Sequence, residues 1–118
     1  MQLEATKYLQ DIRTAADLIA NFTIAKSFSD YAADQMLRSA VERQFEIIGE
    51  AMSRLSDLDR SLAESIPESR RIIAFRNLLI HGYASVDNRI VWGVVEGKLP
   101  GLREKISELI GASSNSGS

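Results

Sequence analysis

Residues 31–55 read YAADQMLRSAVERQFEIIGEAMSRL, and this stretch decides the fold. Large apolar residues recur in it every three or four positions, which is the period of one face of an α-helix. A second apolar stripe runs beside the first, so the helix must contact more than one neighbour. We therefore expect a long central helix from Tyr31 to about Leu55. The two stripes are Leu37, Val41, Phe45, Ile48, Met52 and Leu55, and Met36, Ala40, Ile47 and Ala51.

Helical periodicity also precedes this central segment. An amphipathic helix is predicted from Leu3 to about Ala25, and Ser29 or Asp30 is then placed to cap the central helix. The residues that follow the central helix, 56–65, show little periodicity, and we interpret them as a connector that includes at most a short helical turn.

The second half of the chain carries the signals of further helices. Ser65 and Glu68 have the spacing of a capping box, and the helix that follows should end at His81 or Gly82, where a glycine commonly adopts a left-handed conformation. Asp87 is predicted to cap the next helix.

Pro100 is then expected to open the last helix, because proline is tolerated in a first turn. No segment shows convincing β-alternation. The predicted fold is all-α, an up-and-down bundle of four to five helices. We expect a single helical domain over residues 1–110 and a disordered polar tail over residues 111–118.

The composition narrows the functional classes. A chain of 118 residues is long enough for one domain, and its 45% hydrophobic and 25% charged residues are typical of a globular protein. A formal net charge of −2 argues against broad electrostatic wrapping of nucleic acid, so any RNA contact should be local. Cysteine is absent, which excludes disulfides, thiolate zinc sites and a cysteine nucleophile, and fits a cytoplasmic location.

Targeting and cofactor signals are also missing from this sequence. No apolar run resembles a signal peptide or a membrane span, so we expect neither export by that route nor a membrane partner. The single histidine excludes a multi-histidine metal site, and no glycine-rich phosphate loop is present. We therefore expect no metal and no cofactor.

Residues 76–83 read RNLLIHGY and contain the candidate chemistry. His81 lies in the last turn of its predicted helix, where it either acts in catalysis or interacts with unsatisfied carbonyl groups as a helix-end cation. Tyr83 has a similar alternative, as the apolar partner of a helix C-cap. Arg76 and Asn77 alone are equally compatible with a solvated face, so spacing by itself leaves the question open.

The wider pattern around this motif resembles the HEPN superfamily, and within it the HepT-like branch. The resemblance rests on Arg76, Asn77, His81 and Tyr83 together with five flanking segments. These segments are Ile72-Ile73-Ala74-Phe75, Val86-Asp87, Ile90-Val91-Trp92, Phe45-Glu46-Ile47-Ile48-Gly49-Glu50-Ala51 and Leu99-Pro100-Gly101-Leu102. The likeness covers roughly the whole helical body.

This resemblance implies a metal-independent endoribonuclease that works as a homodimer, with the Arg-x4-His motifs of both protomers facing one cleft. It also implies a toxin of a type VII-like toxin–antitoxin system, with RNA as substrate and a minimal nucleotidyltransferase as antitoxin partner. In this branch the partner attaches AMP to the tyrosine two residues after the histidine, a position that Tyr83 occupies here. Phosphates added there would repel RNA.

The spacing of Arg76 and His81 is consistent with a site shared by two protomers. Residues five apart on an ideal helix differ in direction by about 140°, so one motif does not form a compact pair. A two-fold axis would bring a second arginine and histidine to the same phosphate. One histidine would then act as the base on the ribose 2′-hydroxyl and the other as the acid on the leaving 5′-oxygen, while the arginines hold the phosphate oxygens.

Other residues near the motif have both functional and structural explanations. Asn77 either orients His81, binds RNA or makes a structural hydrogen bond. Arg70, Arg71 and Arg89 either extend a phosphate-binding patch or form a solvated face. We leave Glu46 and Glu50 outside the catalytic set, because Arg43 and Arg54 stand at ion-pair spacing from them. Phe75 and Trp92 are interpreted as core or dimer-seam residues.

Two rival functions remain compatible with the sequence. In the first, a HEPN-type module holds a nucleotide or RNA with the same arginine and histidine and does not cut it. In the second, the chain is a dimeric helical adaptor and the motif is coincidental.

Overall fold

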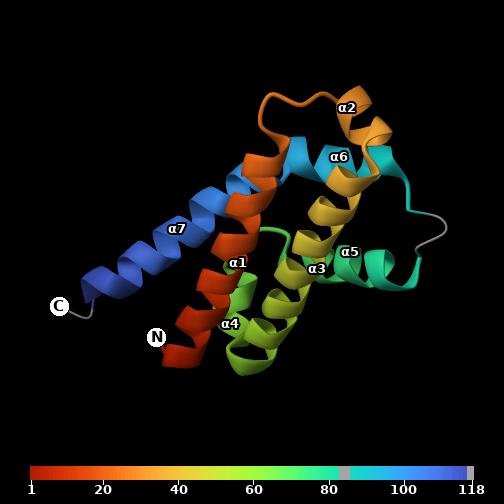
Figure 1. Ribbon diagram of the computed structural model, residues 1–118. Helices are drawn as coiled ribbons and strands as arrows, with labels where there is room; N and C mark the ends of the chain where they lie inside the picture. Colours follow the sequence, from red (N-terminus) through yellow and green to blue (C-terminus); the bar gives the residue numbers. More distant parts are fainter. Residues whose placement is uncertain (83–85, 117–118) are drawn as a thin grey trace.

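A computed structural model describes residues 1–82 and 86–116. The described residues form seven helices and no strand (Figure 1), which confirms the all-α prediction but exceeds the predicted four to five helices. The additional helices are short and lie at the two ends of the central one. The helices are α1 (Leu3–Thr23), α2 (Phe28–Ala33), α3 (Gln35–Leu58), α4 (Arg60–Glu64), α5 (Ser69–His81), α6 (Asn88–Gly97) and α7 (Leu99–Ser116).

Helix α3 is the centre of the molecule, as its two apolar stripes predict. It packs along α1, is crossed by α5, and contacts α2 and α4 at its ends (Figure 1). The whole first stripe is buried, from Leu37 to Leu55. The second stripe is buried only in part, because Ala51 is enclosed while Met36 at the start of the helix is 82% exposed.

The predicted start of the central helix is wrong, because the chain breaks into two helices at Asp34. Helix α2 is capped by Ser27 rather than by Ser29 or Asp30, and Asp30 occupies the third position of that capping box. The Asp34 side chain then accepts a hydrogen bond from the Leu37 amide, 3.0 Å away, and starts α3. The Asp34 carboxylate accepts a backbone hydrogen bond that starts α3, and this local bond competes with continuation of α2 through Asp34.

The predicted connector contains the short helix α4, which Asp59 caps by accepting from the Leu62 amide. The expected capping box of Ser65 and Glu68 is wrong. The Ser65 hydroxyl donates to the Leu62 carbonyl at the end of α4, and Glu68 precedes α5 with a left-handed backbone (φ 61°) and no side-chain cap. The proline between them therefore lies in a turn, outside the helix.

The last two helices begin as predicted. Asp87 caps α6 by accepting from the Arg89 amide at 2.8 Å, and Pro100 lies in the first turn of α7. Helix α7 packs along α1 (Figure 1) and extends to Ser116, so it covers part of the segment in which we expect a disordered tail. Within the described part of the chain, no helix is both long and apolar enough to cross a membrane.

Candidate functional site

Helix α5 carries the Arg-x4-His motif and lies across α3 (Figure 1). Leu79 is its buried anchor, and Phe75 packs edge-on against Phe45 of α3 with ring centroids 5.2 Å apart. The helix ends at His81, as predicted, and the Gly82 amide donates to the Leu78 carbonyl at 2.8 Å. The expected left-handed glycine is wrong, since Gly82 has φ −109°.

Arg76 of α5 packs directly on Gly49 of α3. A Cβ atom built on Gly49 would lie 2.1 Å from the Arg76 Cβ and 2.7 Å from its Cγ, distances that no real contact allows. Only a glycine at this position lets the two helices approach so closely. The stem of Arg76 is thereby packed on the backbone of α3, and its side chain is only 27% exposed.

The Arg76 guanidinium is held by polar partners from two helices. Its Nη2 donates to Glu50 Oε2 in an ion pair, and its Nη1 donates to the Asn77 side-chain oxygen at 2.9 Å. The other carboxylate oxygen of Glu50 accepts from Arg54 Nε at 3.0 Å, so Glu50 bridges two arginines. Arg76 Nε is buried and has no hydrogen-bond partner within the described part of the chain.

His81 lies apart from Arg76 in the same protomer. It is exposed in the last turn of α5, and the described residues contain no hydrogen bond or ion pair between the two side chains. The Asn77 side chain accepts a hydrogen bond from Arg76, and the described residues show no hydrogen bond between Asn77 and His81. Tyr83, the predicted modification site, lies outside the described residues.

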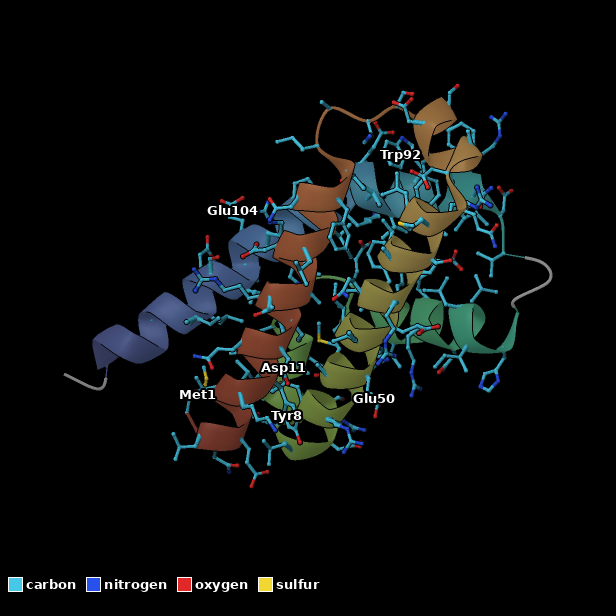
Figure 2. The ribbon with its side chains drawn as sticks, in the orientation of Figure 1. Met1, Tyr8, Asp11, Glu50, Trp92 and Glu104 are labelled. Carbon is cyan, nitrogen blue, oxygen red and sulfur yellow. The ribbon has the colours of Figure 1, made fainter. Side chains whose placement is uncertain are left out.

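A cavity of about 440 Å³ opens beside Arg76, between α1, α3 and α5. Its walls combine cations and carboxylates with apolar side chains and the ring of Tyr8. Figure 2 shows Tyr8 and Asp11 of α1 and Glu50 of α3 in the same end of the molecule. The lining residues are Lys7, Tyr8, Asp11, Arg43, Glu46, Ile47, Glu50, Ala51, Arg54, Arg76 and Ile80.

The neighbouring arginines all have local partners. Arg70 pairs with Glu64 at 3.3 Å and Arg71 with Glu68 at 3.2 Å. Arg89 lies over the Phe28 ring, with its guanidinium carbon 5.2 Å from the ring centroid. Each of the three arginines therefore has a contact within the protein, and Arg70 and Arg71 remain largely exposed.

The structure also shows the partners of Glu46 and Glu50, two residues that the sequence analysis leaves outside the catalytic set. The expected pairs are present, Arg43 with Glu46 at 3.5 Å and Arg54 with Glu50 at 3.0 Å. Glu50 in addition contacts Arg76, which spacing along one helix does not reveal. A signal was present in Gly49, since a glycine costs stability inside a helix and often has a packing or functional reason there.

Two further observations concern the surroundings of the site. Trp92 is a core residue, buried against Tyr31 with ring centroids 5.3 Å apart, whereas Phe75 is partly buried and packs against the core. Among the residues that the structure describes, no group of three histidine, aspartate or glutamate side chains is placed to hold a metal ion.

The fold and the site together define an all-helical domain with an Arg-x4-His motif at the exposed end of one helix, the arginine anchored on the central helix. Comparison with known families agrees with this class. The model of the HepT-like family, described as "Ribonuclease HepT-like", matches residues 12–109. The chain therefore belongs to the HepT-like ribonuclease family.

Individual relatives support the same assignment. "Probable ribonuclease HepT" of Thermococcus cleftensis is 38% identical over 102 residues, which cover 86% of this chain and 92% of the relative. "Putative RNase TTE0752" of Caldanaerobacter subterraneus subsp. tengcongensis is 31% identical over 103 residues, or 87% of this chain and 91% of the relative. No solved structure matches the chain significantly.

Proposed function

We propose that this protein is a metal-independent endoribonuclease that acts as the toxin of a type VII-like toxin–antitoxin system. Membership of a family whose members are named ribonucleases supports the reaction class. The observation that carries the proposal is the placement of Arg76. Its stem packs on Gly49 and its guanidinium is held by Glu50 and Asn77 beside a cavity, on the helix that presents His81 to solvent.

The proposed reaction is attack of a ribose 2′-hydroxyl on the adjacent phosphorus. One His81 takes the 2′ proton as the new bond forms, and a second histidine protonates the 5′-oxygen as the P–O bond breaks. Imidazole suits both roles because it changes protonation state near neutral pH. Arg76 stabilises the negative charge on the non-bridging oxygens. The products are a 2′,3′-cyclic phosphate and a free 5′-hydroxyl.

This division of labour requires two protomers. Arg76 turns toward α3 while His81 is exposed, so a single chain supplies half of the site. The exposed side of α5 includes Leu78, which is 40% exposed, next to Asn77. An exposed leucine beside the motif is suited to an apolar seam between two copies. We place the dimer axis near this side of α5, so that both motifs face one cleft.

The proposed off switch is Tyr83. The family resemblance implies that a minimal nucleotidyltransferase antitoxin attaches AMP to this hydroxyl. Added phosphates two residues from His81 would repel the RNA backbone and fill the cleft. Intact mass after incubation with such a partner and ATP should show adenylyl additions that a Tyr83→Phe variant lacks. An unchanged mass pattern in that variant would place the modification elsewhere.

The ribonuclease proposal is tested with purified protein, RNA and EDTA. Cleavage should persist in the chelator and leave cyclic phosphate ends. Arg76→Ala and His81→Ala should each lower the rate by about 10² to 10⁴, because each removes a group that acts in the transition state. Their far-ultraviolet circular dichroism should stay that of the parent. Full activity in both variants would refute the assignment, and RNA binding without cleavage by the parent would identify a HEPN-type binding module instead.

A further inference from the structure

The cavity beside Arg76 contains side chains that the proposed reaction does not use. Helix α1 contributes Lys7, Tyr8 and Asp11 to its wall, opposite residues of α3 and next to Arg76 and Ile80 of α5 (Figure 2 labels Tyr8 and Asp11). Lys7, Tyr8 and Asp11 lie outside the Arg-x4-His motif and far from it in the sequence. They line the same cavity as Arg76 only in the folded chain.

The two sides of the cavity differ in how their polar groups are satisfied. On the α3 side, Glu46 pairs with Arg43, and Glu50 pairs with both Arg54 and Arg76. On the α1 side, neither Asp11 nor the Tyr8 hydroxyl has a hydrogen bond or an ion pair to any residue that the structure describes. Asp11 is exposed and Tyr8 is half-buried, so both polar groups are accessible to a ligand that enters the cavity.

The dimensions and chemistry of the cavity suit a nucleobase. Its volume of about 440 Å³ is within the range of small-molecule sites. Tyr8 is half-buried and presents an aromatic ring, and Ile47, Ala51 and Ile80 give the wall an apolar portion. Proteins that read single-stranded RNA stack unpaired bases on such rings and bind their Watson–Crick edges with polar side chains.

Building on the proposed ribonuclease function, we propose that this cavity binds the base of the nucleotide next to the phosphate held by Arg76. Tyr8 stacks on the base, and the Asp11 carboxylate accepts hydrogen bonds from its Watson–Crick edge. An ionised carboxylate can only accept, so it favours a base with adjacent N–H donors. Guanine presents two such donors, at N1 and N2, and is the preferred base. Asp11 and Tyr8 are thus specificity-determining residues.

A binding experiment tests the cavity without relying on catalysis. The four probes are GMP, AMP, CMP and UMP, titrated into the protein by calorimetry and by NMR. GMP should bind most tightly, and Asp11→Asn should weaken it by about tenfold, the cost of one lost bidentate base contact. Tyr8→Leu should weaken all four probes, whereas Tyr8→Phe should weaken them less, because it keeps the aromatic ring and loses only the hydroxyl. The charge-matched control is Asp57→Asn, an exposed residue of α3 outside the cavity.

A cleavage experiment tests the same assignment in RNA. Oligonucleotides that differ at one base should be cut preferentially beside guanine, and Asp11→Asn should relax this preference while Asp57→Asn retains it. Tyr8→Leu should raise KM more than it lowers kcat. Cleavage by the parent with no base preference, or a preference that survives Asp11→Asn, would overturn the cavity assignment and leave the ribonuclease proposal standing.

Further outcomes separate the two proposals. Specific GMP binding that Asp11→Asn abolishes, together with an absence of RNA cleavage, would support the base site and refute the ribonuclease. A change of oligomeric mass in Asp11→Asn and Tyr8→Leu, with no effect on nucleotide binding, would show that the cavity is a protein contact and would overturn its assignment to a base.

Discussion

Gly49 sets the distance between the central helix and the helix that carries the motif. Its substitution by alanine would place a methyl group 2.1 Å from the Arg76 Cβ, which belongs to the least flexible part of that side chain. We expect Gly49→Ala to destabilise the protein by about 1–3 kcal/mol, as overpacking does in other cores. Its ribonuclease activity should fall as well, because α5 and Arg76 must move. Denaturant unfolding and the RNA cleavage rate measure both effects.

Gly93 provides the matched control. It is exposed in α6, and a Cβ added there would meet nothing within 4 Å. Alanine is favoured over glycine inside a helix by about 0.5–1 kcal/mol, so Gly93→Ala should raise stability and leave cleavage unchanged. Equal behaviour of the two variants would show that Gly49 is a glycine for some reason other than its contact with Arg76.

Glu50 is the second residue that acts on Arg76, as a positioning group and not as a catalytic one. Its ion pairs are partly exposed, so Glu50→Gln should change stability by no more than about 1 kcal/mol. The Arg76 guanidinium would lose a charge-assisted hydrogen bond, and we expect kcat to fall by about tenfold. The kcat of Glu50→Ala should fall further, because this variant removes the hydrogen-bond acceptor of Arg76 altogether.

Glu46→Gln is the control for Glu50, since Glu46 lines the same cavity but, among the described residues, forms an ion pair with Arg43 alone. It should retain the kcat of the parent. A similar loss of kcat in Glu46→Gln and Glu50→Gln would indicate a general effect of charge in the cavity and would contradict the specific role of Glu50.

Among the helices, the sequence predicts buried faces, because these follow the apolar period. It misses helix boundaries that are decided by competing caps. The stripe from Leu37 to Leu55 correctly identifies the buried face of α3. The break at Asp34 is invisible to periodicity, because the apolar pattern continues across it while a local hydrogen bond to the Leu37 amide decides the boundary. Helices as short as α2 and α4 bury too few residues to produce a pattern of their own.

In the candidate site, too, the sequence predicts features that depend on neighbouring residues and misses contacts between distant helices. The motif on α5 is a local pattern, and its end at His81 was predictable. The contact between Arg76 and Glu50 joins residues 26 positions apart, and it depends on the packing of α5 over Gly49. The cavity adds residues of α1 that no spacing rule connects to α5.

The start of α2 should depend on pH. The Ser27 amide donates to the Asp30 carboxylate at 2.8 Å, and this hydrogen bond holds the pKa of Asp30 below its ordinary value of 3.8. A lowered pKa means that the cap stabilises the folded chain above the ordinary value and is lost as the pH falls through the lowered one. The amide shifts of Ser27 and Asp30, followed by NMR during acidification, should report this transition.

An Asp30→Asn variant should lose this titration of the Ser27 amide, because an amide side chain does not ionise. Titration of Asp30 at or above its ordinary pKa would contradict the capping-box explanation.

For the whole molecule, the net charge is small, but charged side chains gather around one cavity. The chain has a formal charge of −2, yet the cavity beside Arg76 is lined by four cations and three carboxylates. A positive excess confined to one cavity fits recognition of a few phosphates rather than of a long nucleic-acid backbone. Cleavage should therefore depend on local geometry, which the assembly of two protomers would complete.

Leu78 tests that assembly directly. It is 40% exposed on α5 beside the motif, so a charged residue there is tolerated by the single chain but is costly in an apolar seam between two copies. We expect the parent to have the mass of a dimer by light scattering and Leu78→Glu to have the mass of a monomer. The variant should keep nearly the parent melting temperature and lose cleavage, because Arg76 and His81 of one chain form only half of the site.

Met36→Glu, at an 82% exposed apolar position far from the motif in the sequence, should stay dimeric and active. A monomeric Leu78→Glu protein that still cut RNA at the parent rate would show that one protomer suffices, and the two-histidine mechanism would have to be abandoned.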